Sequence, residues 1–187
     1  MGLSGCRGRR RPAEEYHYKI GQAVTPASES NPELAMHPDY LAVSDQLDAK
    51  YRALMAMEPI VAEEVPRDTP EGGIYLFSEN GVHLYAGRTK RRLGVRIRSH
   101  FGTAVDCPFA WLLARERTGF RATYTKKGSR KELLARPEFL AIYNECKQRI
   151  RRMQVRFVAE PEPLRQALLE IYTAIASGAK HNDFETH

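Results

Sequence analysis

The chain has 187 residues, 42% hydrophobic and 28% charged, with a formal net charge of +6, a composition typical of a soluble globular protein. No apolar stretch approaches the roughly eighteen residues of a membrane span, the basic N-terminus leads into no apolar segment of a secretory signal, and the three cysteines lack the paired spacing of a zinc or redox site. We therefore expect a cytoplasmic protein with reduced thiols, no membrane partner and one sizeable core.

The first 71 residues divide into two segments ahead of the expected domain. Residues 1–31 are rich in Gly, Pro, Ser, Glu and Arg, which predicts a flexible basic tail. Residues 32–71 carry 3 basic and 9 acidic side chains, a balance of −6. Within them, residues 32–57 are expected to be helical, because apolar side chains recur every three or four positions, and 63–72 form a linker. This acidic helical arm is also a candidate surface for homo-oligomerisation.

A β-hairpin and a helix open the expected domain, residues 72–187. Residues 73–78 and 82–87 have the β-branched and aromatic content of strands. Asn80-Gly81 lies between them and is the strongest short hairpin signal. A helix over 91–101 follows, since its apolar residues are spaced four apart.

The remainder predicts an insert, one more strand and a final helix. The insert covers about 102–150, with helices over 109–116 and 137–150. Residues 153–159 alternate as a strand does, and the last helix runs from Pro163 to about residue 177, closed by Gly178. The order strand, strand, helix, helical insert, strand, helix predicts an α+β domain.

Positive charge is concentrated in one block. Residues 86–136 carry 14 basic and 3 acidic side chains, a balance of +11, which indicates a polyanionic partner such as DNA. The alternative is that arginine-rich helices simply show a solvated face. The candidate nucleic-acid contacts are Arg88, Lys90, Arg91, Arg92, Arg98, Lys126 and Lys127.

Two tyrosines hold corresponding places on the hairpin. Side-chain alternation puts Gly73, Tyr75 and Phe77 on one face of the first strand, and His83, Tyr85 and Gly87 on one face of the second. If the two faces coincide, Tyr75 lies near Tyr85, but the register is not readable from the sequence. The glycines leave backbone uncovered, which we interpret as room for a phosphate.

Further polar residues could join the two phenols. Arg96 and His100 share a helix face, and Arg88 follows the second strand. Far along the chain, Glu170 clears the buried stripe of the last helix and Asn182 follows it. Each is ordinary alone; together they suit phosphodiester cleavage. In that reaction an arginine stabilises phosphate charge, a carboxylate holds Mg²⁺, and a tyrosine acts as base if positive charge lowers its pKa.

These residues resemble the GIY-YIG nuclease superfamily over 72–101 and 152–182. The first motif is intact at Gly73-Ile74-Tyr75. The second reads Tyr85-Ala86-Gly87, with Ala86 where members usually carry Ile or Val. Arg96 matches the family's catalytic arginine and Glu170 its metal-binding glutamate, while Asn182 matches its late asparagine.

The resemblance implies a fold, a reaction and a cofactor. It implies a small sheet of three antiparallel strands flanked by helices, one Mg²⁺ or Mn²⁺, and hydrolysis of DNA that leaves a 3′-hydroxyl and a 5′-phosphate. Tyr75 would be the general base, with Tyr85 orienting water or sharing that role. His100 would assist proton transfer or contact DNA, Arg88 would lower the phenol pKa or touch phosphate, and Asn182 would hold the site together. The alternative is a nucleic-acid-binding module on the same fold with an idle site.

Overall fold

The computed structural model describes residues 36–103, 107–120 and 128–182. The chain falls into two compact units, Met1–Met36 and His37–His187, and all the helices and strands described below belong to the second. The expected tail, residues 1–31, lies outside the described residues. Within the described ranges, none of the helices has both the length and the apolar content needed to cross a membrane.

A four-stranded antiparallel sheet forms the centre of an α+β fold, in the order β1–β4–β2–β3. Its strands are β1 (Ile60–Val61), β2 (Glu71–Glu79), β3 (Val82–Arg92) and β4 (Gln154–Ala159). The expected number of three strands was wrong. The fourth, β1, comes from the segment that follows the N-terminal helix and adds only two residues along β4, too few to produce a periodic pattern.

The hairpin between β2 and β3 turns where Asn80-Gly81 predicted. Asn80 has φ 52° and Gly81 has φ 78°, and two consecutive positive φ angles are the signature of a type I′ turn. The register shifts after Phe77, because Phe77 pairs with Tyr85 whereas Ser78 pairs with His83. Leu84 is thus the extra residue of a β-bulge.

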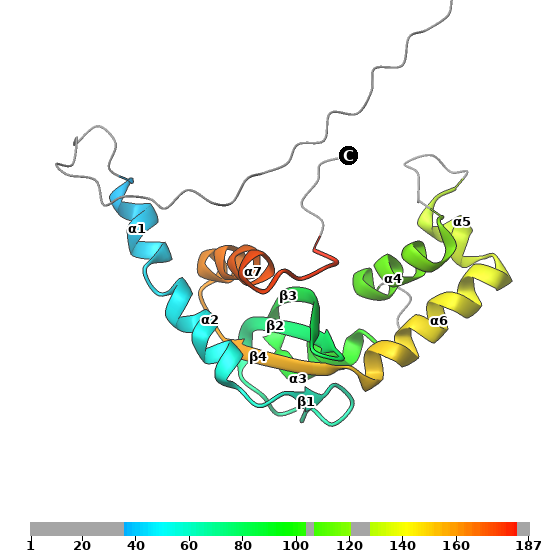
Figure 1. Ribbon diagram of the computed structural model, residues 1–187, viewed down its shortest axis with the longest axis horizontal. Coiled ribbons are helices and arrows are strands. Elements are labelled where there is room, and N and C mark those ends of the chain that lie inside the picture. Colours follow the sequence, from blue (N-terminus) through cyan, green and yellow to red (C-terminus); the bar gives the residue numbers. More distant parts are fainter. Residues whose placement is uncertain (1–35, 104–106, 121–127, 183–187) are drawn as a thin grey trace, which may run out of the picture. The chain divides into compact units, whose positions relative to one another are not determined.

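Helices cover both faces of the sheet (Figure 1). On one side, α3 (Leu93–Ser99), α4 (Pro108–Thr118), α5 (Arg130–Leu134) and α6 (Pro137–Arg152) contribute to a core that contains Tyr75 and Phe77. On the other side, α7 (Pro163–Ser177) and α2 (Leu47–Ala56) bury Ile74 and Leu76. Successive side chains of β2 therefore point to opposite faces of the sheet, and each set is buried in a different core. The expected insert helices and the last helix are confirmed as α4, α6 and α7, and α5 adds a short turn between α4 and α6.

The N-terminal helix is broken in two and packs onto the domain. Helix α1 (Pro38–Ser44) stops before α2 begins, and the Ser44 hydroxyl donates to the Leu41 carbonyl, a local bond that competes with helix continuation. Leu54 is fully buried, and the Tyr172 hydroxyl of α7 donates to Asp48. Helix α2 therefore uses its apolar stripe inside the molecule instead of forming a separate arm.

Candidate active site

Tyr75 lies at the centre of a buried hydrogen-bond network. Its hydroxyl accepts from Arg96 Nε at 3.2 Å and lies 2.9 Å from His100 Nε2. Tyr75 has no exposed surface and His100 is 1% exposed. Tyr75, Arg96 and His100 are therefore grouped as expected, but the Tyr75 and His100 side chains are buried instead of lying at the protein surface.

The two motif tyrosines share a face of the sheet without facing each other directly. Tyr75 pairs with Gly87, and Tyr85 pairs with Phe77, so the two phenols are diagonal neighbours. The imidazole of His100 contacts both rings, with centroid separations of 5.3 Å to Tyr75 and 5.9 Å to Tyr85. We expected His83 and Tyr85 to share one face of β3. The bulge at Leu84 places them on opposite faces, and His83 Nδ1 bonds to Ser78 Oγ on the other face.

Tyr85 is the phenol that reaches solvent. Its ring stacks on Phe109, with centroids 4.7 Å apart and an interplanar angle of 10°. Among the described residues, only Thr173 Oγ1 is a buried side-chain polar atom without a partner, and no described residue hydrogen-bonds the Tyr85 hydroxyl. Tyr85 is partly exposed whereas Tyr75 is fully buried, so it is the less buried of the two phenols.

Glu170 lies in the same electrostatic neighbourhood. Its carboxylate accepts from Arg88 Nε at 3.0 Å, and its side chain is 24% exposed. Burial raises the pKa of Glu170, and Arg88 opposes this shift. After burial itself, the Glu170 charge is the largest contribution that raises the pKa of Tyr85, to about 12. The carboxylate from α7 is thus brought to the hairpin phenols across almost one hundred residues of sequence.

Asn182 binds the backbone of the second motif. Its side-chain Oδ1 accepts from the Ala86 N–H at 2.7 Å, and its Nδ2 donates to the Ala86 carbonyl at 2.8 Å. The preceding His181 N–H donates to the Leu84 carbonyl at 2.8 Å. The segment after α7 therefore satisfies the open edge of β3 and fixes the strand that carries Tyr85.

The glycine of the second motif makes room for a phenol, not for a phosphate. A Cβ atom on Gly87 would lie 2.5 Å from Cζ and the hydroxyl oxygen of Tyr75, and one on Gly73 would lie 2.2 Å from the Val158 carbonyl oxygen. The protein's own atoms fill both spaces. Our interpretation of these glycines as openings for a phosphate was wrong.

We predict that Gly87→Ala destabilises the protein by roughly 1–3 kcal/mol, the usual range for overpacking a core. The added methyl group must displace the buried Tyr75 ring. Gly102→Ala is the matched control, because its Cβ would meet nothing closer than 3.5 Å. Urea unfolding of both variants measures the difference, and equal stability of the two would contradict the close contact.

Burial works against the expected activation of Tyr75. We expected nearby positive charge to lower a phenol pKa. Instead, burial raises the pKa of Tyr75 well above its ordinary value and Tyr85 raises it further, while Arg96 only partly opposes them. A side chain with no exposed surface loses more from desolvation than one guanidinium returns. Tyr75 is therefore a protonated phenol that holds Arg96 and His100 in place.

His100 is neutral at physiological pH and joins the phenol to a thiol. Burial, with Arg96 adding to it, lowers the pKa of His100 to about 3. Its Nδ1 lies 3.4 Å from Cys107 Sγ, which also accepts from the Ala110 N–H. A neutral imidazole with one nitrogen at each of two X–H groups can accept a proton on one side and donate on the other.

The lowered pKa predicts a specific acid sensitivity. Below pH 6.5, the unfolded chain protonates His100 while the folded protein does not, so stability falls by about 1.4 kcal/mol per pH unit until the pH approaches the folded pKa. We therefore expect the stability advantage of wild type over His100→Gln to shrink by roughly 2 kcal/mol between pH 7 and pH 5. Urea unfolding at both pH values measures it. His83 and His181 also have lowered pKa values, but both proteins contain them, so they cancel. An advantage independent of pH would contradict a buried neutral His100.

The candidate nucleic-acid contacts have different surroundings. Lys90 and Arg91 are exposed, and Arg92 pairs with Asp68 and Glu71. Arg98 is half-buried and its Nε donates to the Val65 carbonyl at 2.9 Å, so it ties α3 to a loop, and we no longer assign it to nucleic acid. Lys126 and Lys127 lie outside the described residues.

Sequence reasoning missed the residues that the insert brings to the site. Cys107 contacts His100, its backbone N–H donates to the Tyr143 hydroxyl, and Phe109 supports Tyr85. The Cys-Pro pair at 107–108 is a helix-start signal that the expected helix over 109–116 did not use, and α4 begins there, at Pro108. No sequence signal showed that this helix packs against the hairpin.

No protein-family model, curated protein or solved structure matches this chain. The functional conclusion therefore depends on the site itself.

Proposed function

We propose that this protein is a GIY-YIG-type endonuclease that hydrolyses DNA phosphodiester bonds with the help of one divalent cation. The observation that carries the proposal is the convergence of Tyr85, Arg96 and Glu170 from a strand and two helices, with charges close enough to shift one another's pKa. A phenol, a guanidinium and a carboxylate supply a base, a phosphate clamp and a metal ligand. The fourth strand, β1, lies at the far edge of the sheet from β3 and leaves this arrangement unchanged.

The depth of the two phenols assigns their roles. Tyr85 is the less buried phenol, so its deprotonated form takes the proton of the attacking water and becomes the neutral phenol. Tyr75 has no exposed surface, so it orients Arg96 and shares its hydrogen bond with His100. This assignment exchanges the roles expected from the sequence, where Tyr75 was the base. Arg96 stabilises the charge that develops on the non-bridging phosphate oxygens.

Glu170 would hold the cation. The described residues contain no group of three His, Cys, Asp or Glu side chains that could enclose a metal ion. One partly exposed carboxylate fits Mg²⁺ or Mn²⁺ in this setting, because Mg²⁺ keeps most of its waters and takes further ligands from substrate phosphates. Such an ion would neutralise phosphate charge and ease departure of the leaving oxygen. Arg88 competes for the same carboxylate and neutralises it between turnovers.

Nicking of supercoiled plasmid tests the proposal. We expect the full-length protein to relax plasmid in Mg²⁺ and to stop when the cation is chelated. The products should carry 3′-hydroxyl and 5′-phosphate ends, which ligase can reseal. DNA binding that weakens with salt but never leads to cleavage in Mg²⁺ or Mn²⁺ would overturn this proposal in favour of the idle binding module.

A further inference from the structure

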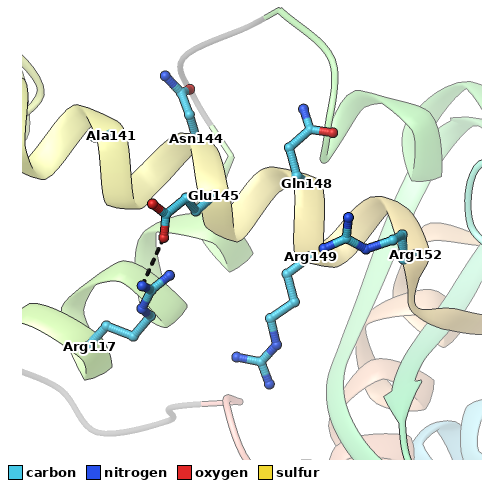
Figure 2. Close-up of a pocket in the computed structure, with 7 residues that line it drawn as sticks. All are labelled: Arg117, Ala141, Asn144, Glu145, Gln148, Arg149 and Arg152. Atoms are coloured by element: carbon cyan, nitrogen blue, oxygen red, sulfur yellow. Dashed lines mark ion pairs between the residues drawn. The ribbon is translucent and has the colours of Figure 1, made fainter.

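Helix α6 carries a row of unused polar side chains. Phe139, Tyr143 and Ile150 are buried, so the helix faces the core along one stripe. Asn144, Gln148 and Arg152 follow one another at intervals of four on the opposite side, and all three are exposed. No described residue forms a hydrogen bond or ion pair with any of them. Figure 2 shows the two amides projecting side by side from the helix.

An open hollow of about 530 Å³ accompanies this row. It is lined by the row itself, by Ala141, Glu145 and Arg149 of α6 and by Arg117 of α4. Arg149 is held by Glu79 at 2.6 Å, and Arg117 is held by Glu145 at 2.8 Å. The hollow therefore combines two anchored guanidinium groups and the Glu145 carboxylate, which is paired with one of them, with two amides that have no partner among the described residues. A solvated helix face with basic residues in its last turn would account for Arg152 and for the amides, but not for the hollow beside them.

We propose that α6 enters the major groove of double-stranded DNA and that Asn144 and Gln148 read base edges there. The proposal rests on the endonuclease function and names its substrate class. An exposed α-helix fits the major groove of B-form DNA, and Asn and Gln pair bidentately with adenine. The DNA strand that borders the groove then lies in the hollow, where Arg117, Arg149 and Arg152 contact its phosphates. Exposed Ala141, one turn before Glu145, lets the helix approach the bases closely.

The geometry favours DNA over RNA and predicts a spacing. A-form RNA has a deep and narrow major groove that side chains cannot read. Residues four apart on a helix are separated by about 6 Å along its axis, while successive bases of one strand rise by about 3.4 Å. The two amides therefore reach adenine-containing pairs that lie about two steps apart.

Selection of bound sequences from a random duplex DNA pool, in a chelating buffer at one fixed salt concentration, tests this inference without cleavage. We expect the full-length wild type to enrich two adenine positions. Asn144→Ala and Gln148→Ala should each lose the preference at one of them, by roughly five- to a hundredfold. Arg152→Ala should weaken binding to all sequences and lower the salt slope by about one. Gln46→Ala, an exposed amide at the start of α2 without a side-chain cap bond, is the matched control and should bind as wild type does.

The outcomes separate this inference from the proposed function. Equal enrichment of sequences by wild type and the Asn144→Ala, Gln148→Ala double variant would overturn the inference, as would no enrichment at all. Equal competition by duplex RNA of the selected sequence would do the same. Cleavage of DNA without sequence preference would support the proposed endonuclease function and contradict base recognition by Asn144 and Gln148. Selective binding without cleavage in Mg²⁺ would support base recognition by α6 and contradict the proposed endonuclease function.

Discussion

Replacing Glu170 by Gln is expected to reduce Mg²⁺-dependent nicking by at least a hundredfold while the protein stays folded. The substitution keeps the shape of the side chain and removes the charge that holds the cation, and loss of one group that stabilises a transition state typically costs two to three orders of magnitude. The fold should tolerate the change, because the Arg88–Glu170 pair is partly exposed and such pairs contribute at most about 1 kcal/mol.

Two controls make the Glu170 prediction specific. Glu138→Gln removes an exposed carboxylate from the start of α6, away from the phenols, and should cleave as wild type does. Raising the Mg²⁺ or Mn²⁺ concentration should restore part of the Glu170→Gln activity, since weakened metal binding is compensated by mass action. Full activity of Glu170→Gln at low Mg²⁺ would show that another group binds the cation, and the assignment of α7 to the site would fail.

The elements that the sequence predicted are those with strong local signals. Asn80-Gly81 determined the hairpin through its positive φ angles, and the 3.6-residue periodicity of 163–177 matched α7 to the residue. Short or interrupted elements had no such signal. The strand Ile60–Val61 exists only because β4 lies beside it. The helix expected over 32–57 is interrupted after Ser44, whose hydroxyl bonds to the Leu41 carbonyl.

The composition of the site was predictable, but its depth was not. Helix periodicity placed Arg96 and His100 on one face, and the resemblance to the GIY-YIG superfamily added Glu170 to Tyr75 and Arg96 without any knowledge of register. The pKa directions depend instead on what lies above each side chain, and that is set by α4 packing on the hairpin. Phe109 and Cys107 come from the insert, so the burial that raises the phenol pKa values and lowers that of His100 is a tertiary effect.

The same difference in depth predicts opposite behaviour of the two tyrosine variants. Tyr85→Phe should lower the cleavage rate by roughly a hundred- to ten-thousandfold, the range for loss of a general base, with little effect on stability. Tyr75→Phe should cleave faster than Tyr85→Phe but unfold more easily, by roughly 1–3 kcal/mol, because it leaves buried His100 and half-buried Arg96 without their shared partner.

The pH dependence of cleavage identifies which phenol is the base. With the pKa of Tyr85 raised to about 12, its deprotonated fraction grows tenfold per pH unit throughout the neutral range. The wild-type rate should therefore rise with a slope near one on a logarithmic scale between pH 6.5 and pH 9. That slope should persist in Tyr75→Phe and disappear in Tyr85→Phe. Single-turnover nicking at saturating Mg²⁺ measures it. If Tyr75→Phe loses both the slope and the larger share of the rate, the buried phenol is the base after all, and the site must open before it cuts.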